Sequence, residues 1–235
     1  MEFTSAGRVI LVRHAQASFG SANYDQLSER GEQQAQRLAA WLVAHPELNF
    51  SHVAAGSLRR HAQTLAAIEQ AFTQARRALP ALTQDSDWNE FDHEALIRVY
   101  AAQHAGDTLL AAAYSDHRAA HALMSAVLHA WADGELDGGI PESWAVFGAR
   151  VARARARLDA APRGRILVVS SGGTIARCAQ AALGCDDRRA VTLNLALRNT
   201  AVSEFRTRDA DWQLHIWNML PHLAAPADRD HVTYY

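Results

Sequence analysis

The stretch RVILVRHAQ, residues 8–16, decides the fold. Its apolar run, Val9 to Val12, is typical of a strand buried on both faces of a sheet. Arg13 and His14 follow at once, where such a strand would end. Open α/β sheets bind ligands in the crevice at the carboxyl ends of their strands. The stretch therefore predicts a buried first strand that delivers an arginine and a histidine to a binding crevice.

The segments after this strand alternate between helix and strand patterns. Residues 28–45 predict a helix that Ser28 caps and Pro46 follows. Residues 52–55 predict a short strand and residues 58–75 a second helix. Elements in this order, joined by loops of a few residues, are typical of an α/β layered fold.

This alternation breaks after Pro80 and resumes later. Residues 92–138 are rich in alanine and histidine and predict helices interrupted at Gly106. The later segments predict a helix, a strand, a helix and two strands that alternate as at a sheet edge: 142–160, 166–169, 170–184, 200–206 and 212–217. We predict a single domain over residues 1–235, a three-layer α/β sandwich with a mostly parallel central sheet and helices on both faces. Its core spans about 8–91 and 142–223, and a helical lid is inserted at about 92–141.

Composition limits the class of partner. The chain has 235 residues, 49% of them hydrophobic, with a formal charge of −2 and no long run of like charges. We therefore expect a small substrate, no nucleic acid and no membrane. Two cysteines, Cys178 and Cys185, and no helical ligand spacing such as HExxH lead us to expect no metal and no cofactor. Residues 1–7 show no signal-peptide pattern, and no segment reaches the ~20 apolar residues of a membrane span, so the expected compartment is the cytoplasm.

Several short motifs occur in a fixed order. They are LVRHAQ (11–16), LSERGEQQA (27–35), SLRRHAQT (57–64), WNEFD (88–92), SSGGTIA (170–176), NTAVSEF (199–205) and WNMLPHL (217–223). Together they resemble the histidine phosphatase superfamily, the phosphoglycerate-mutase-like proteins. The resemblance covers the core and not the lid.

The resemblance implies a role for three residues near the first strand. His14 would be the nucleophile, since a neutral imidazole is nucleophilic near pH 7 and forms a labile phosphoramidate. Arg13 and Arg60 would bind the phosphoryl oxygens, because a guanidinium matches phosphate bidentately. Arg59 is a rival for the second role. Arg60 is favoured because the family's arginine is followed by glutamine and threonine at the spacing of Gln63 and Thr64.

The resemblance also implies a general acid and base. Glu90 lies in the WNEF context where the family carries this carboxyl group, which would protonate the leaving oxygen and then activate water. Asp92 and Glu94 are close enough in the sequence to substitute for it.

The chain departs from the family pattern at two positions. Ser171 stands where the family usually has a histidine that donates a hydrogen bond to the phosphoryl group. A serine hydroxyl still donates one bond, and the backbone N–H groups of Gly172 and Gly173, at a helix N-terminus, favour an anion. Ala17 lacks the hydroxyl that the family carries there, and Gln16 or Ser18 are candidates to supply the missing phosphate contact. We expect weakened rather than abolished catalysis.

Three functional hypotheses follow. The first is a phosphatase that hydrolyses a small phosphomonoester through a phosphohistidine on His14. The second is a phosphoglycerate mutase, which the short loop 19–26 disfavours because it lacks the tryptophan-asparagine signature of the glycolytic mutases. The third is a weakly active or inactive protein that binds a phospho-ligand, and it predicts that Ser171→His would greatly raise turnover.

The lid and the last strands leave two questions open. Basic lid residues either bind a second anionic group or form ordinary helix surface: His93, Arg98, His104, His117, Arg118 and His121. Apolar residues within 212–220 are candidates for a strand-edge contact in a homodimer.

Overall fold

The computed structural model describes residues 7–18, 25–136, 138–161, 164–208 and 210–234. Among these residues, six strands form one central sheet in the order β3-β2-β4-β1-β5-β6. The strands are β1 (Gly7–Arg13), β2 (His52–Ala55), β3 (Leu82–Gln84), β4 (Arg165–Ser170), β5 (Val202–Arg208) and β6 (Asp211–Met219). The first four in this order are parallel, and β5 and β6 are antiparallel at one edge. The mostly parallel sheet predicted from the sequence is confirmed.

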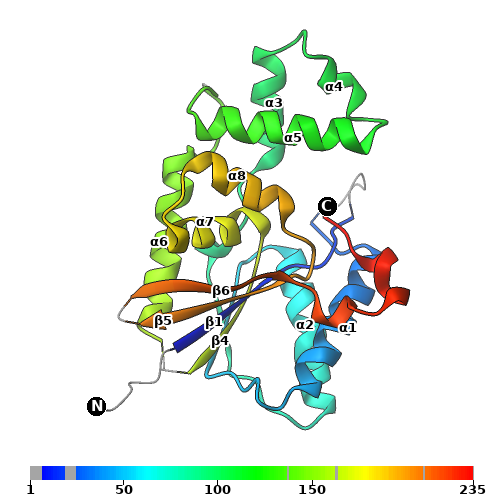
Figure 1. Cartoon of the computed structure of the whole chain (residues 1–235), viewed down its shortest axis with the longest axis vertical. Coiled ribbons are helices and arrows are strands. Elements are labelled where there is room, and N and C mark those ends of the chain that lie inside the picture. Colours follow the sequence, from blue (N-terminus) through cyan, green and yellow to red (C-terminus); the bar gives the residue numbers. More distant parts are fainter. Residues whose placement is uncertain (1–6, 19–24, 137, 162–163, 209, 235) are drawn as a thin grey trace.

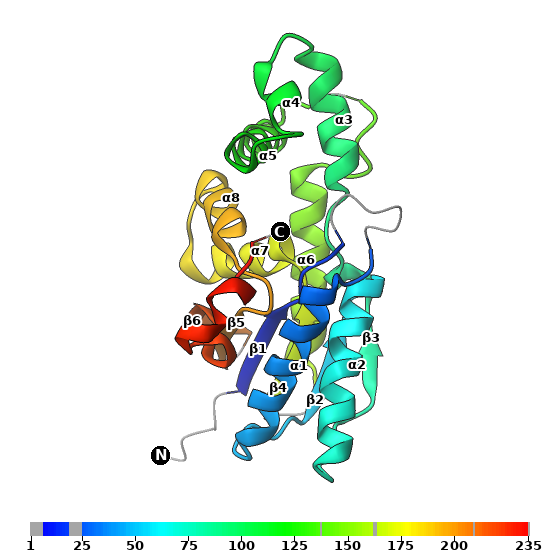
Figure 2. The same cartoon turned by 90° about the vertical axis from the view of Figure 1, so that its right-hand side faces the viewer.

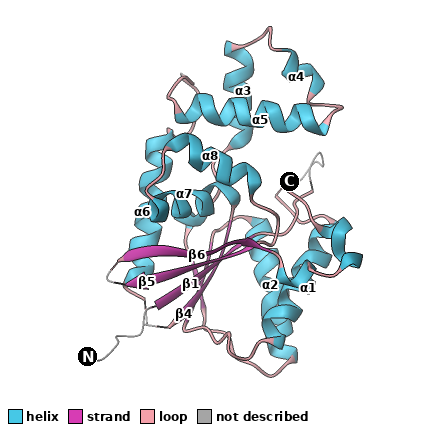
Figure 3. Ribbon diagram, viewed as in Figure 1, coloured by secondary structure: helices cyan, strands magenta, loops and turns pink. Residues whose placement is uncertain are grey.

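Helices cover both faces of the sheet and extend beyond it. The α-helices are α1 (Glu29–Ala44), α2 (Arg59–Gln74), α3 (His93–Gln103), α4 (Thr108–Ala112), α5 (His117–Ala132), α6 (Trp144–Asp159), α7 (Gly172–Leu183) and α8 (Asp187–Ala196). Three short 3-10 turns are η1 (Ser86–Trp88), η2 (Pro221–Leu223) and η3 (Pro226–His231). Figure 3 shows the strands, in magenta, between α6 and α7 on one side and α1 and α2 on the other.

The alternation of side chains along β1 explains the three layers. Ile10 and Val12 point into an apolar cluster with residues of α1 and α2. Val9 and Leu11 point the opposite way, into a cluster with residues of α6 and α7. Because successive residues of a strand face opposite sides, a run of four apolar residues buries a strand on both faces.

Helices α3, α4 and α5 lie together at one end of the molecule, away from the strands (Figures 1 and 2). They are not a separate body, because the apolar cluster that contains Val9 and Leu11 also contains Leu96, Leu123 and Trp131 of these helices. Apolar packing therefore continues from one face of the sheet into the region predicted to be a lid. None of the helices in the described part of the chain combines the length and the apolar character that a membrane crossing requires.

Two elements, β3 and α8, were not predicted from the sequence. Strand β3 has three residues, all exposed, so no apolar alternation marks it. Helix α8 starts at the Asp186 cap but buries only Ala190 and Val191, too few residues for a visible stripe. The prediction that apolar residues within 212–220 are available for a strand-edge contact needs a correction at Trp212. This ring is 1% exposed, lies 5.5 Å from the Phe205 ring, and donates through Nε1 to Asp159.

Gly31, in the first turn of α1, allows the helix to approach the loop after β1. A Cβ atom at this position would lie 2.1 Å from the carbonyl oxygen of Gln16. We expect Gly31→Ala to destabilise the protein by roughly 1–3 kcal/mol, although alanine favours a helix by about 1 kcal/mol. Urea unfolding measures this change. Gly106→Ala is the matched control, because its Cβ would meet nothing within 4 Å. Equal stability of the Gly31 variant and the wild type would contradict the expected clash.

Candidate active site

The register of the sheet brings two predicted clusters to the same edge. Arg13 pairs with Ser170 across the parallel strands β1 and β4. His14 then donates its backbone N–H to the Ser170 carbonyl at 2.8 Å, so the residues after both strands leave the sheet at one level. The N-terminus of α7, preceded by Ser171, therefore lies beside His14, as a switch-point crevice requires.

His14 is held in one orientation and one tautomer. Its ring is 4% exposed, with Nδ1 2.7 Å from the Ala15 carbonyl oxygen and Nε2 3.1 Å from Nε of Arg60. A carbonyl only accepts and a guanidinium only donates, so Nδ1 carries the proton and Nε2 presents its lone pair. Burial, followed by the charges of Arg60 and Arg13, lowers the pKa of His14 well below its usual value. The imidazole is therefore neutral at pH 7.

Two arginines flank this imidazole. Arg60, in the first turn of α2, is 5% exposed and forms an ion pair of 2.6 Å with Asp25. Arg13 donates through Nη1 to the carbonyl of Leu197, at the end of α8. Arg59 is exposed on the other side of α2, and its backbone N–H donates to Asp25. The structure thus brings Arg13 and Arg60 to His14 and leaves Arg59 at the surface.

Glu90 completes the charged part of the site. Its Oε2 accepts the backbone N–H of Gly173 at 3.0 Å. Burial raises the pKa of Glu90, while the Gly173 bond and the charges of Arg60 and Arg13 act in the opposite direction. The other two candidate carboxyl groups lie elsewhere, since Asp92 caps α3 through Ala95 and Glu94 is exposed.

Arg150 of α6 fixes the segment that carries Glu90. Its Nη1 donates to the carbonyl oxygens of Asp87 and Asn89 at 3.1 and 2.7 Å. Its Nε and Nη2 donate to both carboxylate oxygens of Glu142. One guanidinium therefore joins the chain just before α3 to the chain just before α6. A planar, forked cation is suited to this multiple contact.

The N-terminus of α7 is shaped by small residues. Ser171 is fully buried, and its Oγ lies 2.7 Å from Nε2 of His61. A Cβ on Gly172 would lie 2.6 Å from Asn194 and 3.6 Å from Nε of Arg13, and one on Gly173 would lie 2.4 Å from Oε1 of Glu90. These short separations show how closely the helix terminus approaches both side chains.

The loop after His14 uses its polar groups internally. The Oε1 atom of Gln16 accepts a hydrogen bond from Ser28 at 3.0 Å, and its backbone N–H donates to Gln34. The Ser18 hydroxyl donates to the Leu27 carbonyl, and Ala17 forms a single bridge with Leu27. Gln16 and Ser18 were predicted to replace the hydroxyl missing at Ala17. Both side chains form hydrogen bonds with residues just before α1, Ser28 and Leu27. Most of the loop 19–26, residues 19–24, lies outside the described residues.

The basic lid residues do not form one group. His93 is half-buried, and burial, followed by the charge of Arg60, lowers its pKa. His104 stacks on Tyr100 at 4.2 Å between ring centroids. The other positions, Arg98, His117, Arg118 and His121, are exposed. The charge of Arg60 thus acts on His93, whereas these four side chains lie at the surface.

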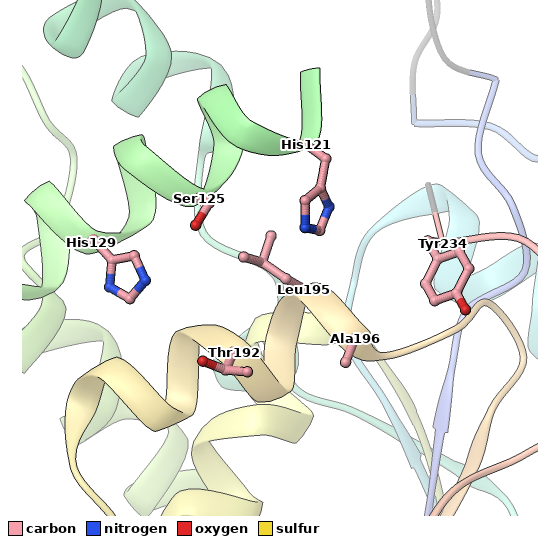
Figure 4. A pocket seen from close by; sticks show the side chains of 7 residues that line it. All are labelled: His121, Ser125, His129, Thr192, Leu195, Ala196 and Tyr234. Atoms are coloured by element: carbon pink, nitrogen blue, oxygen red, sulfur yellow. The ribbon is translucent and has the colours of Figure 1, made fainter. Parts of the chain in front are cut away.

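A cavity of about 450 Å³ lies between the lid and the core. Figure 4 shows His121, Ser125 and His129 on α5 opposite side chains of α8, with Tyr234 at the far end. The α8 wall, which ends at Ala196, directly precedes Leu197, whose carbonyl binds Arg13. One wall of this cavity is thus followed directly in the sequence by the residue that binds Arg13.

The sequence matches a known protein family. A sequence model of the histidine phosphatase superfamily (branch 1) matches residues 9–220, most of the chain. The chain belongs to that superfamily. No curated protein matches it closely enough to narrow the assignment.

Solved structures of phosphatases and of a mutase share this fold at low sequence identity. A phosphoserine phosphatase variant of Entamoeba histolytica, in complex with phosphoserine, is 18% identical with a TM-score of 0.62, covering 92% of this chain and 98% of its own. Phosphoglycerate mutase of Bacillus anthracis is 17% identical with a TM-score of 0.62, covering 93% and 95%. A mycobacterial glucosyl-3-phosphoglycerate phosphatase is 20% identical with a TM-score of 0.60, covering 92% and 100%. Phosphatases and a mutase share this fold, so the fold does not choose between the reactions.

Three residues of this superfamily member were not singled out by the sequence analysis. Asp25 pairs with Arg60, and Asn199 donates to the His14 carbonyl at 3.3 Å. His61 lies 5.6 Å from the His14 ring, centroid to centroid. His61 had a usable signal, because a histidine directly follows Arg60 in a chain that lacks one at position 171. Asp25 had none, since only the folded chain places it beside α2.

Proposed function

We propose that the protein is a phosphatase that hydrolyses a small phosphomonoester through a phosphohistidine on Nε2 of His14. The observation that carries this proposal is the fixed imidazole, with its Nδ1 proton on the Ala15 carbonyl and its Nε2 lone pair facing Arg60. A neutral histidine beside two arginines is a nucleophile placed against a cation-lined site for a phosphate. This chemistry requires no cofactor.

In the first step, the Nε2 lone pair of His14 attacks phosphorus and the ester P–O bond breaks. The leaving oxygen takes a proton from Glu90, whose raised pKa favours the protonated form that this step needs. The products are phosphohistidine, the free alcohol and the Glu90 carboxylate.

In the second step, the Glu90 carboxylate takes a proton from water and the water oxygen attacks phosphorus. The P–N bond breaks, its electron pair returns to Nε2, and inorganic phosphate leaves. Glu90 is protonated again, so each turnover restores the starting state. One carboxyl group thus serves as acid and then as base.

The phosphoryl oxygens would be bound by Arg13, Arg60, Ser171 and the backbone N–H of Gly172 at the start of α7. Arg60 already points at Nε2, and its ion pair with Asp25 holds the guanidinium there. A helix N-terminus favours an anion through its dipole and its N–H groups. We keep Gln16 as a weaker candidate, because Ser28 already uses its Oε1.

The alcohol part of the substrate would extend from the arginines toward the lid. His93 and the cavity that Leu195, Ala196 and Tyr234 line offer polar and apolar contacts there. We propose residues 92–141 as a lid over a small phosphorylated substrate. A homodimer through the edge strand β6, where Met219 is 46% exposed, stays a prediction.

A rapid-quench experiment with ³²P-labelled phosphoester tests the proposal. We expect a labelled protein that is labile in acid and stable in alkali, as phosphoramidates are, and no label in His14→Asn. A coupled assay for 2-phosphoglycerate measures mutase activity in the same preparation. Turnover without any labelled protein, or equal turnover in His14→Asn, would contradict the mechanism. Mutase activity well above hydrolysis would replace the phosphatase with a mutase.

A further inference from the structure

His61 and Ser171 form a buried pair that the mechanism above uses only in part. Both side chains are fully buried, and Nε2 of His61 lies 2.7 Å from Oγ of Ser171. His61 belongs to the first turn of α2, while Ser171 precedes the first residue of α7. The contact therefore joins the two helix N-termini that bring Arg60 and Gly172 to His14.

The Ser171 hydroxyl does not make the capping hydrogen bond that an N-cap serine ordinarily makes. Ser171 is the N-cap of α7, yet its side chain makes no capping hydrogen bond. An N-cap serine usually accepts a bond from an N–H in the first turn of its helix. The caps of α1 and α6, Ser28 and Ser143, do make that bond, to Gly31 and Val146. At Ser171 the hydroxyl bonds to an imidazole instead, and the Gly173 N–H in the first turn of α7 bonds to Glu90. The hydroxyl therefore does not compete with an anion for the N–H groups at this helix terminus.

The surroundings make room for the imidazole. A Cβ on Gly56, just after β2, would lie 2.3 Å from Nδ1 and 2.7 Å from Cε1 of His61. Any residue other than glycine would collide with the ring. Burial, reinforced by the charge of Arg60, lowers the pKa of His61 to about 3, so the ring is neutral in the free protein and carries one N–H.

We infer that His61 is a positioning residue that directs the Ser171 hydroxyl toward the phosphoryl group, so that the pair does the work of the histidine absent at position 171. We assign the single ring proton to Nε2 of His61, which then donates to Oγ of Ser171, and the hydroxyl proton of Ser171 points to a phosphoryl oxygen. No covalent bond forms or breaks in this arrangement. Ser171 touches the substrate, and His61 acts through it. This inference rests on the proposed phosphatase function.

The pair also changes what Ser171→His should do. A histidine at position 171 would project into the space that the His61 ring occupies, because the two side chains are already 2.7 Å apart. Overpacking of a buried site forces side chains out of their preferred positions. In the wild-type background Ser171→His should therefore lower turnover. In a His61→Ala background the vacated space accepts the new ring, and the same substitution should raise turnover.

Steady-state kinetics of the full chain with p-nitrophenyl phosphate test this inference. We expect His61→Ala and Ser171→Ala each to lower kcat by roughly 10²-fold, with a smaller change in KM, as for a lost oxyanion-type donor. The double variant should be no slower than the slower single variant, because the two residues act as one unit. His61→Gln, which can place an amide N–H near the position of Nε2, should recover part of kcat.

His222→Ala is the matched structural control. His222 is also buried, and its Nε2 lies 2.8 Å from the Thr200 hydroxyl. This variant should lower the melting temperature without the loss of kcat. Additive losses at positions 61 and 171, or a Ser171→His that acts equally in both backgrounds, would overturn the inference. Phosphohistidine labelling distinguishes failure of the inference about His61 and Ser171 from failure of the proposed phosphatase function. Label on His14 with full kcat in His61→Ala refutes only the pair, and absence of label in wild type refutes the phosphatase.

Discussion

Glu90→Gln is expected to lower kcat for an alkyl phosphate by roughly 10²–10⁴-fold, the range for loss of a general acid–base group. Glutamine keeps the shape of the side chain and can still accept the Gly173 N–H, but it cannot donate a proton to the leaving oxygen or take one from water. With p-nitrophenyl phosphate, whose leaving group is stable as an anion, the first step loses less than the second. Labelled phosphohistidine should therefore accumulate in the variant, and rapid-quench labelling measures it.

Glu94→Gln is the control for this experiment. Glu94 lies in the first turn of α3 and is exposed, so its substitution should leave both steps at the wild-type rate. Wild-type kcat in Glu90→Gln, or a large loss in Glu94→Gln, would move the acid–base role away from Glu90.

The protein is also expected to lose stability steeply as the pH falls below about 6.5, the ordinary pKa of histidine. Burial lowers the pKa of His61 to about 3 and that of His222 to about 4, and the pKa of His14 is lowered as well. Between these values and 6.5 the unfolded chain binds more protons than the folded one, so stability rises with pH in this window and is lost as pH falls through it. Each such histidine contributes about 1.4 kcal/mol per pH unit.

Glu90 acts in the opposite direction, because its raised pKa lets the folded state keep a proton that the unfolded chain releases. The three histidines outweigh it, and a typical domain has only about 5–15 kcal/mol to lose. Urea unfolding at about pH 7, 6 and 5 measures the slope. His222→Asn should reduce that slope by about one proton, or ~1.4 kcal/mol per pH unit. A free energy of unfolding that stays constant over this range would contradict the buried, neutral state of these rings.

The elements with periodic apolar residues could be predicted from the sequence. The strand predicted at 52–55 matches β2, and the helices predicted at 28–45 and 58–75 match α1 and α2 within a residue or so at each end. Gly184 follows the end of α7, close to where the helix predicted at 170–184 ends, with a φ of 62°, a left-handed conformation that favours glycine. These elements are specified by local pattern, so no knowledge of their neighbours was needed.

The site could be predicted only in part, because its hydrogen bonds join distant segments. The ordered motifs singled out His14, Arg60 and Glu90. The structure places Arg60 against the His14 ring and Glu90 against the backbone N–H of Gly173 in α7. The partner of Ser171 could not be read from a single motif, since His61 lies 110 positions away in the sequence. From position 171 alone, the sequence predicts one remaining hydroxyl donor and weakened catalysis. The fold places an imidazole of another helix, that of His61, beside the Ser171 hydroxyl.

Arg150 holds together the two ends of the inserted segment that contains α3, α4 and α5. This side chain holds Asn89 and Glu142, the two places where the chain leaves the sheet-bearing part and returns to it. Insertions, deletions or transplanted sequence between these two points would leave the separation of the junctions unchanged. The contacts of Arg150 thereby limit how far changes in that segment alter the position of the carboxyl group at position 90. Chimaeras that exchange residues 92–141 between homologues should therefore inherit substrate preference from one parent and chemistry from the other. The donated segment must supply an apolar side chain in place of Trp131, to pack against the rings that contact it from outside the segment.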